Sequence, residues 1–420
     1  MNKDKLIGYV GLSHLSMSYS LASVKRGYQV AIFDFDNKLM NKFSNLELDF
    51  NESDLLKKFK SLKSSYYLSN DIKNLKKCNL IFISLDVKTD AKNISNYSKI
   101  KKYIYFLHKK INKKIPFVIQ SQLIPGFCNN LKINDREIYY QVETLIFGKA
   151  FKRALNPDRI IVGYNKDKNE RFNKFYSDYL SKFKCQVIRM DYLSAEISKI
   201  AINIFLSSSV TLANILSRLS EKIGGNYKFI EKALRSDERI GLNSYLNPGL
   251  GISGGNLERD LTSLQNILEK NDINSDFIHS IIKNSNLSKN WISEVFLKIY
   301  RQNKIKNISL IGLSYKKNNS SLKNSPSILF LKKIKKLRIN IDIYDDLIKN
   351  YDGQDVSKIE NTTQNPELVI FARDFRNFDL IVKKFFYNKT KLKYCIDPFN
   401  LVKDKYILKS KVKVFQVGKK

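Results

Sequence analysis

Apolar segments of strand length alternate with helical patterns in the first half of the chain. Residues 6–10 are a short apolar run, residues 15–25 carry apolar side chains at helical spacing, and residues 28–33 form a second strand of the buried type. Further elements are predicted as strands at 79–85, 116–119, 138–140 and 159–162 and as a helix at 98–113. This alternation is typical of a doubly wound parallel sheet.

The pattern changes at Ser194. Residues 195–222 form a long, largely apolar helical pattern that contains no Pro or Gly, and helical patterns continue to about residue 302. A second strand–helix–strand unit follows, with a helix predicted at 325–337 and strands at 305–311, 340–344, 367–371 and 394–396.

We therefore predict an α/β protein with two Rossmann-like doubly wound parallel-sheet domains joined by a helical central domain. The expected domains are 1–190, 191–303 and 304–420, because 420 residues are too many for one compact core. A weak similarity between the two Rossmann halves is the only internal repeat that we find in the sequence.

The composition of the chain limits its expected location and binding partners. The sequence contains no run of 18 uncharged apolar residues, and its first residues lead straight into a strand, so we expect a cytoplasmic protein without membrane association. The net charge of +34 comes from lysines spread through almost every segment, which indicates a coding bias rather than a nucleic-acid-binding face. A basic surface would still attract anionic ligands.

The cysteines and histidines form no recognisable metal motif. The cysteines lie within or beside apolar segments without any CxxC spacing, so we expect buried thiols and no metal site. The residues concerned are Cys78, Cys128, Cys185, Cys395, His14, His108 and His279.

A small-residue turn follows the first predicted strand. Residues 11–16 read GLSHLS, so Ser13 and Ser16 replace the last two glycines of a GxGxxG fingerprint, while Gly11 keeps the tight turn. A helix N-terminus there still offers amides to a diphosphate. Asp34 closes the next strand, where an acid binds the adenosine ribose and repels a 2′-phosphate. These residues predict NAD rather than NADP; the alternative is a plain turn with a surface Asp.

Residues 251–260 identify a family. They read GISGGNLERD and resemble GFGGSCFPKD, the active-site loop of the UDP-glucose/GDP-mannose dehydrogenase family. Without a gap, the catalytic Cys of the family falls on Asn256 and its Lys on Arg259, which the resemblance places at the cofactor. The final Asp is kept as Asp260.

Further blocks extend the resemblance over nearly the whole chain. Residues 120–126, QSQLIPG, resemble KSTVPPG, with Gln122 in place of a Thr that helps to hold the catalytic water. Residues 140–143 and 155–159 resemble YNPE and LNPDR, so that Glu143 falls on the catalytic Glu, whereas a second Glu of that segment has become Phe147. The alternative for Glu143 is a solvated residue or a helix start.

The long helix carries a polar pair. Residues 196–206 resemble ELAKLASNAFL, and Lys199 and Asn203 are four residues apart, so they project from one helix face. The resemblance implies that both bind the sugar and stabilise the oxyanion, with Asp260 ordering water beside Lys199. The alternative is a polar stripe at a domain interface, because unpaired polar groups in an apolar helix are costly.

Four later blocks resemble substrate-binding segments. DERIG and YLNPG at 237–241 and 245–249 imply that Arg239 crosses a dimer interface to the substrate of the neighbouring subunit, and that Tyr245 and Asn247 belong to a loop around the nucleotide. GLSYKKN and SP, beginning at 312 and 325, resemble GLAFKPN and SP and place Lys316 at the nucleotide sugar. The Arg-Glu before SP is replaced by Lys323-Asn324, and Phe399 replaces the Arg of a late D-x-R-N motif, so substrate recognition is expected to differ.

The absence of a cysteine at position 256 affects which oxidation steps are expected. Family members oxidise a sugar C6 alcohol to a carboxylate in two hydride transfers, and the Cys holds the aldehyde as a thiohemiacetal, which an amide cannot form. The resemblance implies an NAD-dependent oxidoreductase acting on a CH–OH group of a UDP-hexose in surface polysaccharide precursor synthesis, with partial oxidation here. The apolar helix and Arg239 predict a homodimer. The alternatives are a non-catalytic nucleotide-sugar-binding homologue with a regulatory or scaffolding role, and another Rossmann dehydrogenase acting on small hydroxy acids.

Overall fold

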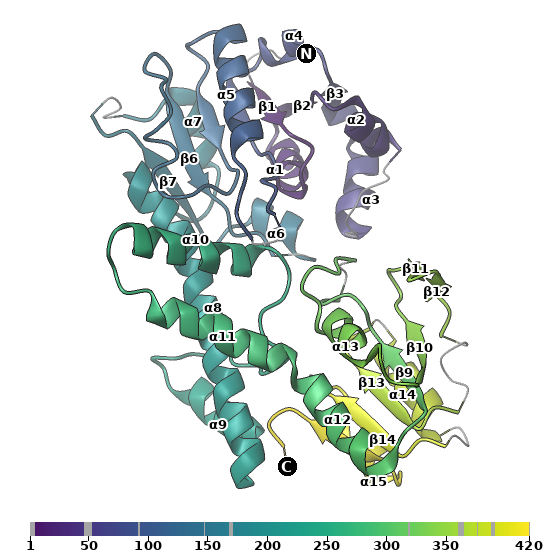
Figure 1. Cartoon of the computed structure of the whole chain (residues 1–420). Coiled ribbons are helices and arrows are strands. Elements are labelled where there is room, and N and C mark those ends of the chain that lie inside the picture. The colour runs from purple at the N-terminus through teal and green to yellow at the C-terminus, as the bar shows by residue number, and fades with distance from the viewer. Residues whose placement is uncertain are drawn as a thin grey trace. The chain divides into compact units, whose positions relative to one another are not determined.

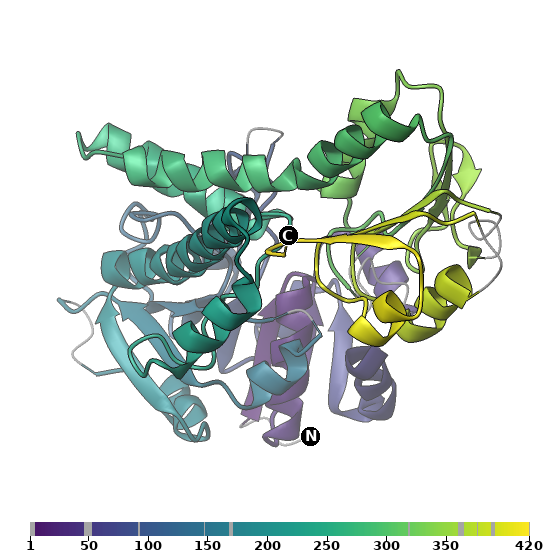
Figure 2. The same cartoon turned by 90° about the horizontal axis from the view of Figure 1, so that it is seen from below.

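The computed structural model describes residues 5–45, 53–90, 93–146, 148–167, 171–317, 320–359, 365–375, 377–387 and 391–419. The chain divides into two compact units, Met1–Ile202 and Asn203–Lys420, and the division falls within the helix α8, Tyr192–Ile223 (Figures 1 and 2). Whether the central helices and the second Rossmann-like part act as separate domains stays a prediction.

The first unit is built on an eight-stranded sheet in the order β3-β2-β1-β4-β5-β6-β7-β8. All neighbouring strands are parallel except β6 and β7, which pair antiparallel, so the predicted parallel sheet is correct apart from this one pair. The strands are β1 Leu6–Val10, β2 Gln29–Phe33, β3 Tyr66–Ser69, β4 Leu80–Ile83, β5 Phe117–Ile119, β6 Ile138–Val142, β7 Arg159–Tyr164 and β8 Gln186–Asp191.

Helices bury both faces of this sheet, which explains why its strands are apolar without alternation. Ile81 and Ile83 point to a core shared with Leu107 of α5, whereas Phe82 points to the opposite core, shared with Met17 of α1. The helices are α1 His14–Lys25, α2 Asn37–Ser44, α3 Ser53–Ser61, α4 Ile72–Leu75, α5 Ser98–Lys110, α6 Ala150–Leu155 and α7 Lys174–Ser181, with a 3-10 turn at Lys63–Ser65.

The second unit combines helices with a five-stranded sheet. Its helices α9 Tyr227–Ser236, α10 Asn256–Lys270, α11 Asp276–Lys289 and α12 Trp291–Asn303 precede a parallel sheet in the order β10-β9-β13-β14-β15. The remaining elements are β9 Asn307–Ile311, α13 Pro326–Ile334, β10 Asn340–Tyr344, the small hairpin β11 Asn350–Tyr351 and β12 Gln354–Asp355, β13 Leu368–Phe371, α14 Phe378–Tyr387, β14 Tyr394–Asp397, α15 Asp404–Leu408 and β15 Lys413–Gln416.

Helix α8 is the longest element, with 32 residues. Serine hydroxyls along it donate to carbonyls one turn back, as Ser207 does to Asn203 and Ser220 to Leu216, so the serines fit an apolar helix. By length and composition alone α8 is able to span a membrane, with one third of its most apolar window buried. One such helix is weak evidence for a membrane span, because core helices of soluble proteins have the same composition.

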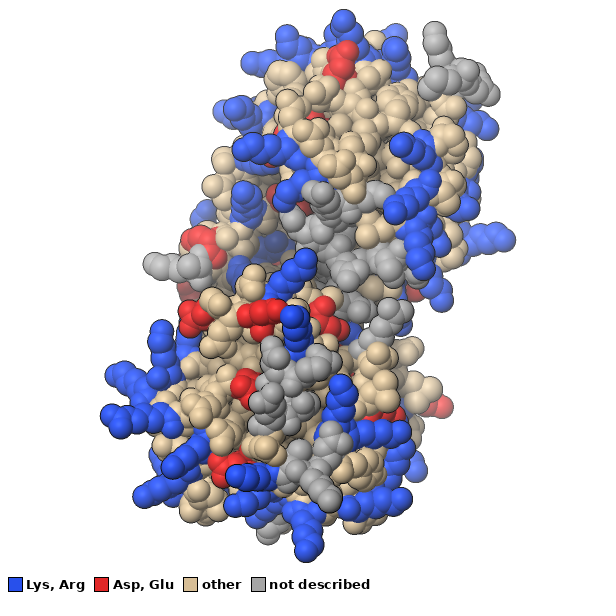
Figure 3. Space-filling view, turned by 90° about the vertical axis from the view of Figure 1, so that its right-hand side faces the viewer, with Lys and Arg blue, Asp and Glu red and all other residues tan. Residues whose placement is uncertain are grey.

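Basic side chains are distributed rather than gathered. Figure 3 shows Lys and Arg scattered over one face of the molecule among uncharged side chains, with fewer Asp and Glu. This distribution agrees with the even spacing of lysines along the sequence.

Candidate active site

The predicted glycine turn follows β1. Gly11 has φ of +103°, and its amide donates to the Phe33 carbonyl at 2.8 Å. A Cβ at this position would lie 3.0 Å from the Ser84 carbonyl oxygen, so the turn requires glycine. Ser13 caps α1: its hydroxyl accepts a hydrogen bond from the Ser16 amide at 3.0 Å. The Ser13 hydroxyl therefore accepts a hydrogen bond from one of the backbone amides that were predicted to bind a diphosphate.

Asp34 directly follows β2 and faces this turn. Its carboxylate accepts hydrogen bonds from the Leu12 amide at 2.9 Å, from the Asp36 amide at 3.0 Å and from the Tyr103 hydroxyl at 3.4 Å. The residue is 1% exposed, so it is not the surface Asp of the alternative interpretation. Tyr103, on α5, was not identified in the sequence, because nothing in the helical pattern distinguishes it from a packing tyrosine.

Glu143 directly follows the strand β6 in the first unit. Gln120 and Gln141 donate to its Oε1 atom at 3.3 and 3.1 Å, and its Oε2 atom is buried. Burial raises the pKa of Glu143 to about 8, against smaller opposing effects of Tyr19, Gln141 and the charge of Lys199. Glu143 and Lys199 are therefore within electrostatic reach of one another, and Glu143 is mostly protonated at neutral pH.

Gln120 was not the residue that the resemblance singled out in this segment, which was Gln122. Gln120 is 2% exposed and also accepts a hydrogen bond from the Ser84 hydroxyl at 2.8 Å. Glu196, from the same helix as Lys199, is a packing residue that accepts the amide of Cys128 at 2.8 Å.

The second unit contains a connected polar group around the predicted loop. The Asn203 side chain donates to Asp260 Oδ2 at 2.5 Å, and Asp260 Oδ1 lies 3.5 Å from the Nε atom of Arg259. Arg259 in turn donates to Asn256 Oδ1 at 3.2 Å. Asp260 and Arg259 are 2% and 7% exposed. The structure therefore brings together four residues that the sequence placed at the site, joined by two hydrogen bonds and one ion pair.

Glycines hold the loop before α10 in close contact with its neighbours. A Cβ on Gly251, at φ of +73°, would lie 2.4 Å from the Ser285 carbonyl oxygen, and one on Gly254 would lie 2.7 Å from the Tyr315 ring. The Ile252 amide also donates to the Ser285 hydroxyl at 2.8 Å. Tyr315 belongs to the segment predicted to bind the nucleotide sugar, so this segment and the loop are adjacent.

The other predicted substrate residues lie on exposed turns of the second unit. Arg239 has a side chain that is 89% exposed and forms a bidentate ion pair with Asp237 at 2.6 and 3.0 Å. Tyr245 and Lys316 are exposed, and the Asn247 side chain accepts a hydrogen bond from Arg235 at 2.8 Å. Arg235 is a further residue that the sequence did not single out.

The Phe399 ring packs on Gly249 in the loop that was predicted to surround the nucleotide. A Cβ on Gly249 would lie 2.8 Å from this ring. The ring therefore stands against the loop, where the family motif has a guanidinium group.

Three of the four cysteines are buried. Cys395 is the single cysteine after residue 202, and it is fully buried on β14. Cys78 and Cys128 are buried as expected, whereas Cys185 is partly exposed, contrary to the prediction. Among the described residues, no group of three His, Cys, Asp or Glu side chains is placed to hold a metal ion.

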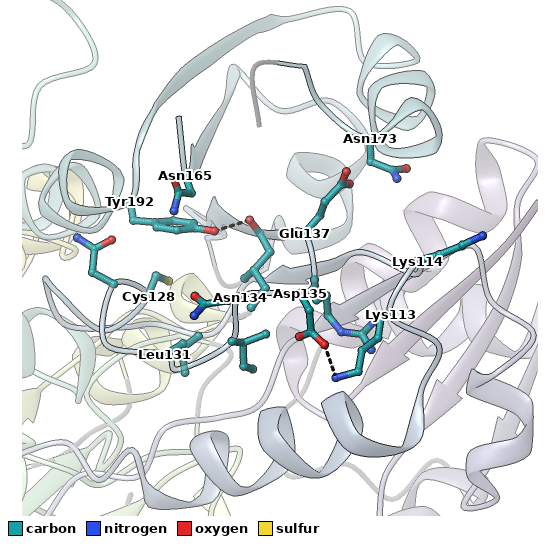
Figure 4. Close-up of a pocket in the computed structure, with 14 residues that line it drawn as sticks. Lys113, Lys114, Cys128, Leu131, Asn134, Asp135, Glu137, Asn165, Asn173 and Tyr192 are labelled. Atoms are coloured by element: carbon teal, nitrogen blue, oxygen red, sulfur yellow. Dashed lines mark hydrogen bonds and ion pairs between the residues drawn. The ribbon is translucent and has the colours of Figure 1, made fainter. Parts of the chain in front are cut away.

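A cavity of about 810 Å³ lies elsewhere in the first unit (Figure 4). Its lining includes Lys113, Asp135, Glu137 and Tyr192, and the close-up shows Lys113 paired with Asp135 at 3.0 Å. Glu137 precedes β6, so the cavity lies at the amino edge of the parallel strands. The predicted residues Gly11, Asp34 and Glu143 follow strands at the carboxyl edge, where open α/β sheets bind their ligands.

The glycine turn and the acid after the next strand define the first unit as a dinucleotide-binding α/β unit. Three models of one family match the chain in sequence order: its NAD binding domain matches residues 7–203, its central domain 193–286 and its UDP binding domain 309–404. The chain belongs to the UDP-glucose/GDP-mannose dehydrogenase family. Its cofactor is NAD, as the match to the NAD binding domain implies.

Individual relatives cover nearly the whole chain. The UDP-glucose 6-dehydrogenase of Rickettsia felis is 26% identical over 98% of this chain and 95% of its own length, and that of Rickettsia conorii is 27% identical over 98% of both. Two solved structures share the fold. One is a UDP-glucose dehydrogenase from Pyrobaculum islandicum, with TM-score 0.84, 15% identity and coverage of 99% and 98% of the two chains. The other is a UDP-D-ManNAc dehydrogenase from Pyrococcus horikoshii, with TM-score 0.82, 18% identity and coverage of 98% and 99%.

The residues at the glycine turn fit NAD. An ionised carboxylate has about four acceptor sites, and Asp34 uses three, the longest of them to the Tyr103 hydroxyl. A ribose hydroxyl is able to take the place of this 3.4 Å contact while the two backbone amides keep the carboxylate in position.

Proposed function

We propose that this chain oxidises a CH–OH group of a nucleotide sugar of the UDP-hexose type with NAD and releases a carbonyl product. The observation that carries the proposal is the chain of contacts from Asn203 through Asp260 and Arg259 to Asn256, in which the catalytic groups are kept and the thiol is replaced by an amide. A carboxamide cannot add to an aldehyde to hold it for a second oxidation.

The proposed mechanism assigns one task to each residue. Gly11, Ser13, Ser16 and Asp34 would hold NAD, which would supply the hydride acceptor. Lys199 stabilises the developing oxyanion as a cation, and one Nδ2 hydrogen of Asn203 is left for the same oxygen, because the other is donated to Asp260.

Proton transfer is assigned to a water held by Asp260. Glu143 contributes as a base only when it is ionised, which its raised pKa of about 8 restricts to alkaline conditions. Hydrated aldehyde is able to give up a second hydride without a thiol, but more slowly.

The substrate contacts belong to the same proposal. Arg239, Tyr245, Asn247 and Lys316 are assigned to the nucleotide sugar, and Arg259 to the cofactor side of the loop. The exposure of Arg239, Tyr245 and Lys316 supports a role toward a ligand or a neighbouring subunit rather than in the core.

We also propose a homodimer. Phe205, Leu212 and Leu219 of α8 are 76%, 55% and 50% exposed, at spacings of seven residues that place them on one side of the helix, and Phe229 of α9 is 71% exposed. Such an exposed apolar surface marks an interaction site. Sedimentation at micromolar concentration should show a dimer, and Leu212→Lys should dissociate it; a native chain that is only monomeric would contradict this assembly.

The setting follows from the chemistry of the product. Oxidised nucleotide sugars are precursors for surface polysaccharides, and a cytoplasmic location gives access to both nucleotide sugars and NAD. The second candidate function is a non-catalytic nucleotide-sugar-binding homologue with a regulatory or scaffolding role, which is favoured by Asn256 and by Phe399 at the nucleotide loop.

Product analysis tests the oxidation. The chain is incubated with NAD and a panel of nucleotide sugars, and the products are detected by mass. We expect one NADH per sugar and an aldehyde or ketone, and Asn256→Cys should restore acid formation. Lys199→Ala should lower the rate by roughly 100-fold or more, since it removes oxyanion stabilisation. Two NADH per sugar and a uronic acid from the native chain would contradict partial oxidation, and no turnover at all would favour the non-catalytic function.

A further inference from the structure

A buried ion pair lies immediately beside the proposed catalytic chain of contacts. Glu258, in the first turn of α10, pairs through its Oε1 atom with the Nζ atom of Lys289, at the end of α11. The two side chains are 14% and 4% exposed. A buried ammonium group depends on its partner, because removal of one member leaves an uncompensated charge in the protein interior. This pair therefore ties the first turn of α10 firmly to α11.

The second oxygen of Glu258 makes a different connection. Its Oε2 atom accepts a hydrogen bond from the side-chain amide of Asn324, which precedes the N-cap residue of α13. The carbonyl of the adjacent Lys323 accepts the Gly254 amide at 3.3 Å. Two neighbouring residues of the UDP binding domain thus contact the loop on both sides of Asn256, one before it and one after it.

Both partners depart from the family pattern at these positions. In the ungapped comparison of residues 251–260 with GFGGSCFPKD, Glu258 replaces Pro, and Asn324 replaces the Glu of Arg-Glu. Asn324 has φ of +55°, a region in which Asn is favoured over other side chains with a Cβ. In this chain the carboxylate is therefore absent from position 324 and present at position 258, which Asn324 contacts.

We propose that Glu258 is a positioning residue that, with Lys289 and Asn324, couples the nucleotide-binding segment to the turn carrying Asn256 and Asp260. When the bound nucleotide restricts the motion of the segment around Asn324, the hydrogen bond from Asn324 to Glu258 also restricts the motion of the first turn of α10. The ion pair with Lys289 keeps the Glu258 carboxylate in position for this hydrogen bond. The proposal rests on the proposed function, because it assumes that the segment binds a nucleotide.

Hydrogen exchange tests the coupling without turnover. Exchange at the amides of residues 256–260 is measured for the full chain, free and with saturating UDP, in the native protein and in Glu258→Gln and Asn324→Gly. Glycine tolerates the positive φ of residue 324, so Asn324→Gly removes the amide without backbone strain. Glu269→Gln is the matched control, since Glu269 lies on α10 but contacts Gln265 and Ser275.

We expect UDP to slow exchange at 256–260 in the native chain and in the control. In the two variants most of this protection should be lost. In Glu258→Gln the UDP affinity should change by less than about threefold, because Glu258 is not assigned to the ligand. Native-like protection in both variants would overturn the proposal, and so would an absence of UDP binding to the native chain. Lack of oxidation with any sugar would leave this measurement unchanged and would count only against the proposed activity.

A second comparison separates positioning from plain stabilisation. Lys289→Met alone should unfold the second unit at lower temperature, whereas Glu258→Leu with Lys289→Met should recover most of that loss, because an apolar pair replaces a buried ion pair at little cost. The double variant lacks the carboxylate that Asn324 contacts. Recovered stability without recovered UDP-dependent protection supports positioning; recovery of both would overturn it.

Discussion

The two Rossmann-like halves use the same turn, but they treat the acid beside it differently. Gly11 and Gly312 have φ of +103° and +106°, and each donates its amide to the end of the following strand at 2.8 Å. The amide of the next residue then donates to an acid, Asp34 in the first half at 2.9 Å and Asp345 in the second at 2.8 Å. The similarity is therefore one of backbone geometry, down to individual hydrogen bonds.

The difference lies in the remaining partners of the acids. Asp345 is fully buried and pairs at 3.0 Å with Arg373, which is itself 2% exposed, so its charge is neutralised inside the protein. Asp34 accepts hydrogen bonds only from neutral donors among its described contacts, two backbone amides and the Tyr103 hydroxyl. The same turn thus yields a structural acid in one half and an acid suited to a sugar hydroxyl in the other. A ligand-binding role requires that no protein cation takes the charge.

The largest effect on stability is expected when the ion pair between Asp345 and Arg373 is broken. Arg373→Met leaves Asp345 buried without its cation and should destabilise the second unit by about 3 to 5 kcal/mol. The single tryptophan, Trp291, lies in this unit and is 5% exposed, so its fluorescence reports unfolding. Arg338→Met, at an exposed position, is the control. A variant as stable as the control would show that Asp345 does not need its partner.

The halves should also respond to pH in opposite directions. The pKa of Glu143 is raised to about 8 in the folded protein. Its contribution to the free energy of unfolding is therefore fully present below the pKa of Glu143 in the unfolded chain, and it is lost as the pH rises through 8. For Asp345, burial raises the pKa, but Arg373 and backbone donors outweigh this effect and hold it below the usual value. Its contribution is therefore present above the unfolded pKa and is lost as the pH falls through the lower folded value.

Glu143→Gln tests this pH response in the first unit. The variant should be more stable than the native chain by a few kcal/mol at about pH 9, with little difference at about pH 5. Hydrogen exchange of the β6 amides measures the effect, and Glu137→Gln at the start of the same strand is the control. If the native chain keeps equal stability at both pH values, Glu143 does not have the raised pKa.

A smaller effect is expected from Asp34. Asp34→Ala removes the acceptor for the ribose and should weaken NAD by about 1 to 2 kcal/mol, roughly tenfold, with a smaller effect on NADP. Calorimetric titration of both cofactors measures the change. Asp345→Asn is the matched control from the other half and should leave NAD affinity unaltered. Equal native affinities for NAD and NADP would remove the basis for the assignment.

The smallest effect is expected from Tyr103→Phe. The Tyr103 hydroxyl occupies the side of Asp34 that is assigned to the ribose, at 3.4 Å. Removing this weak contact should tighten NAD by about two- to threefold, since the ribose no longer competes for the carboxylate. The same titration measures it. Weaker binding would show that the hydroxyl contacts the cofactor rather than covering its site.

Most of the regular structure was predictable because the sheets are covered on both faces. Buried parallel strands must be apolar throughout, so runs such as residues 6–10 and 80–83 stand out, and the residues that depend on backbone geometry, above all Gly11, appear in the motif itself. The strands β3, β8 and β15 were missed because none of them is a continuous buried run and each lies at the edge of its sheet. The two-residue strands β11 and β12 were also missed. The antiparallel pairing of β6 and β7 has no local signal.

By itself, the sequence therefore determined the family, the fold class and the cofactor. Only the tertiary structure decided which atoms of the predicted site residues meet. It set the contact between Asn203 and Asp260 across 57 residues, the contact of Gln120 with Glu143, and the presence of Arg373 beside Asp345. The physical reason is that a carboxylate acts through its desolvation and its neighbours, and both come from segments that are distant in the chain.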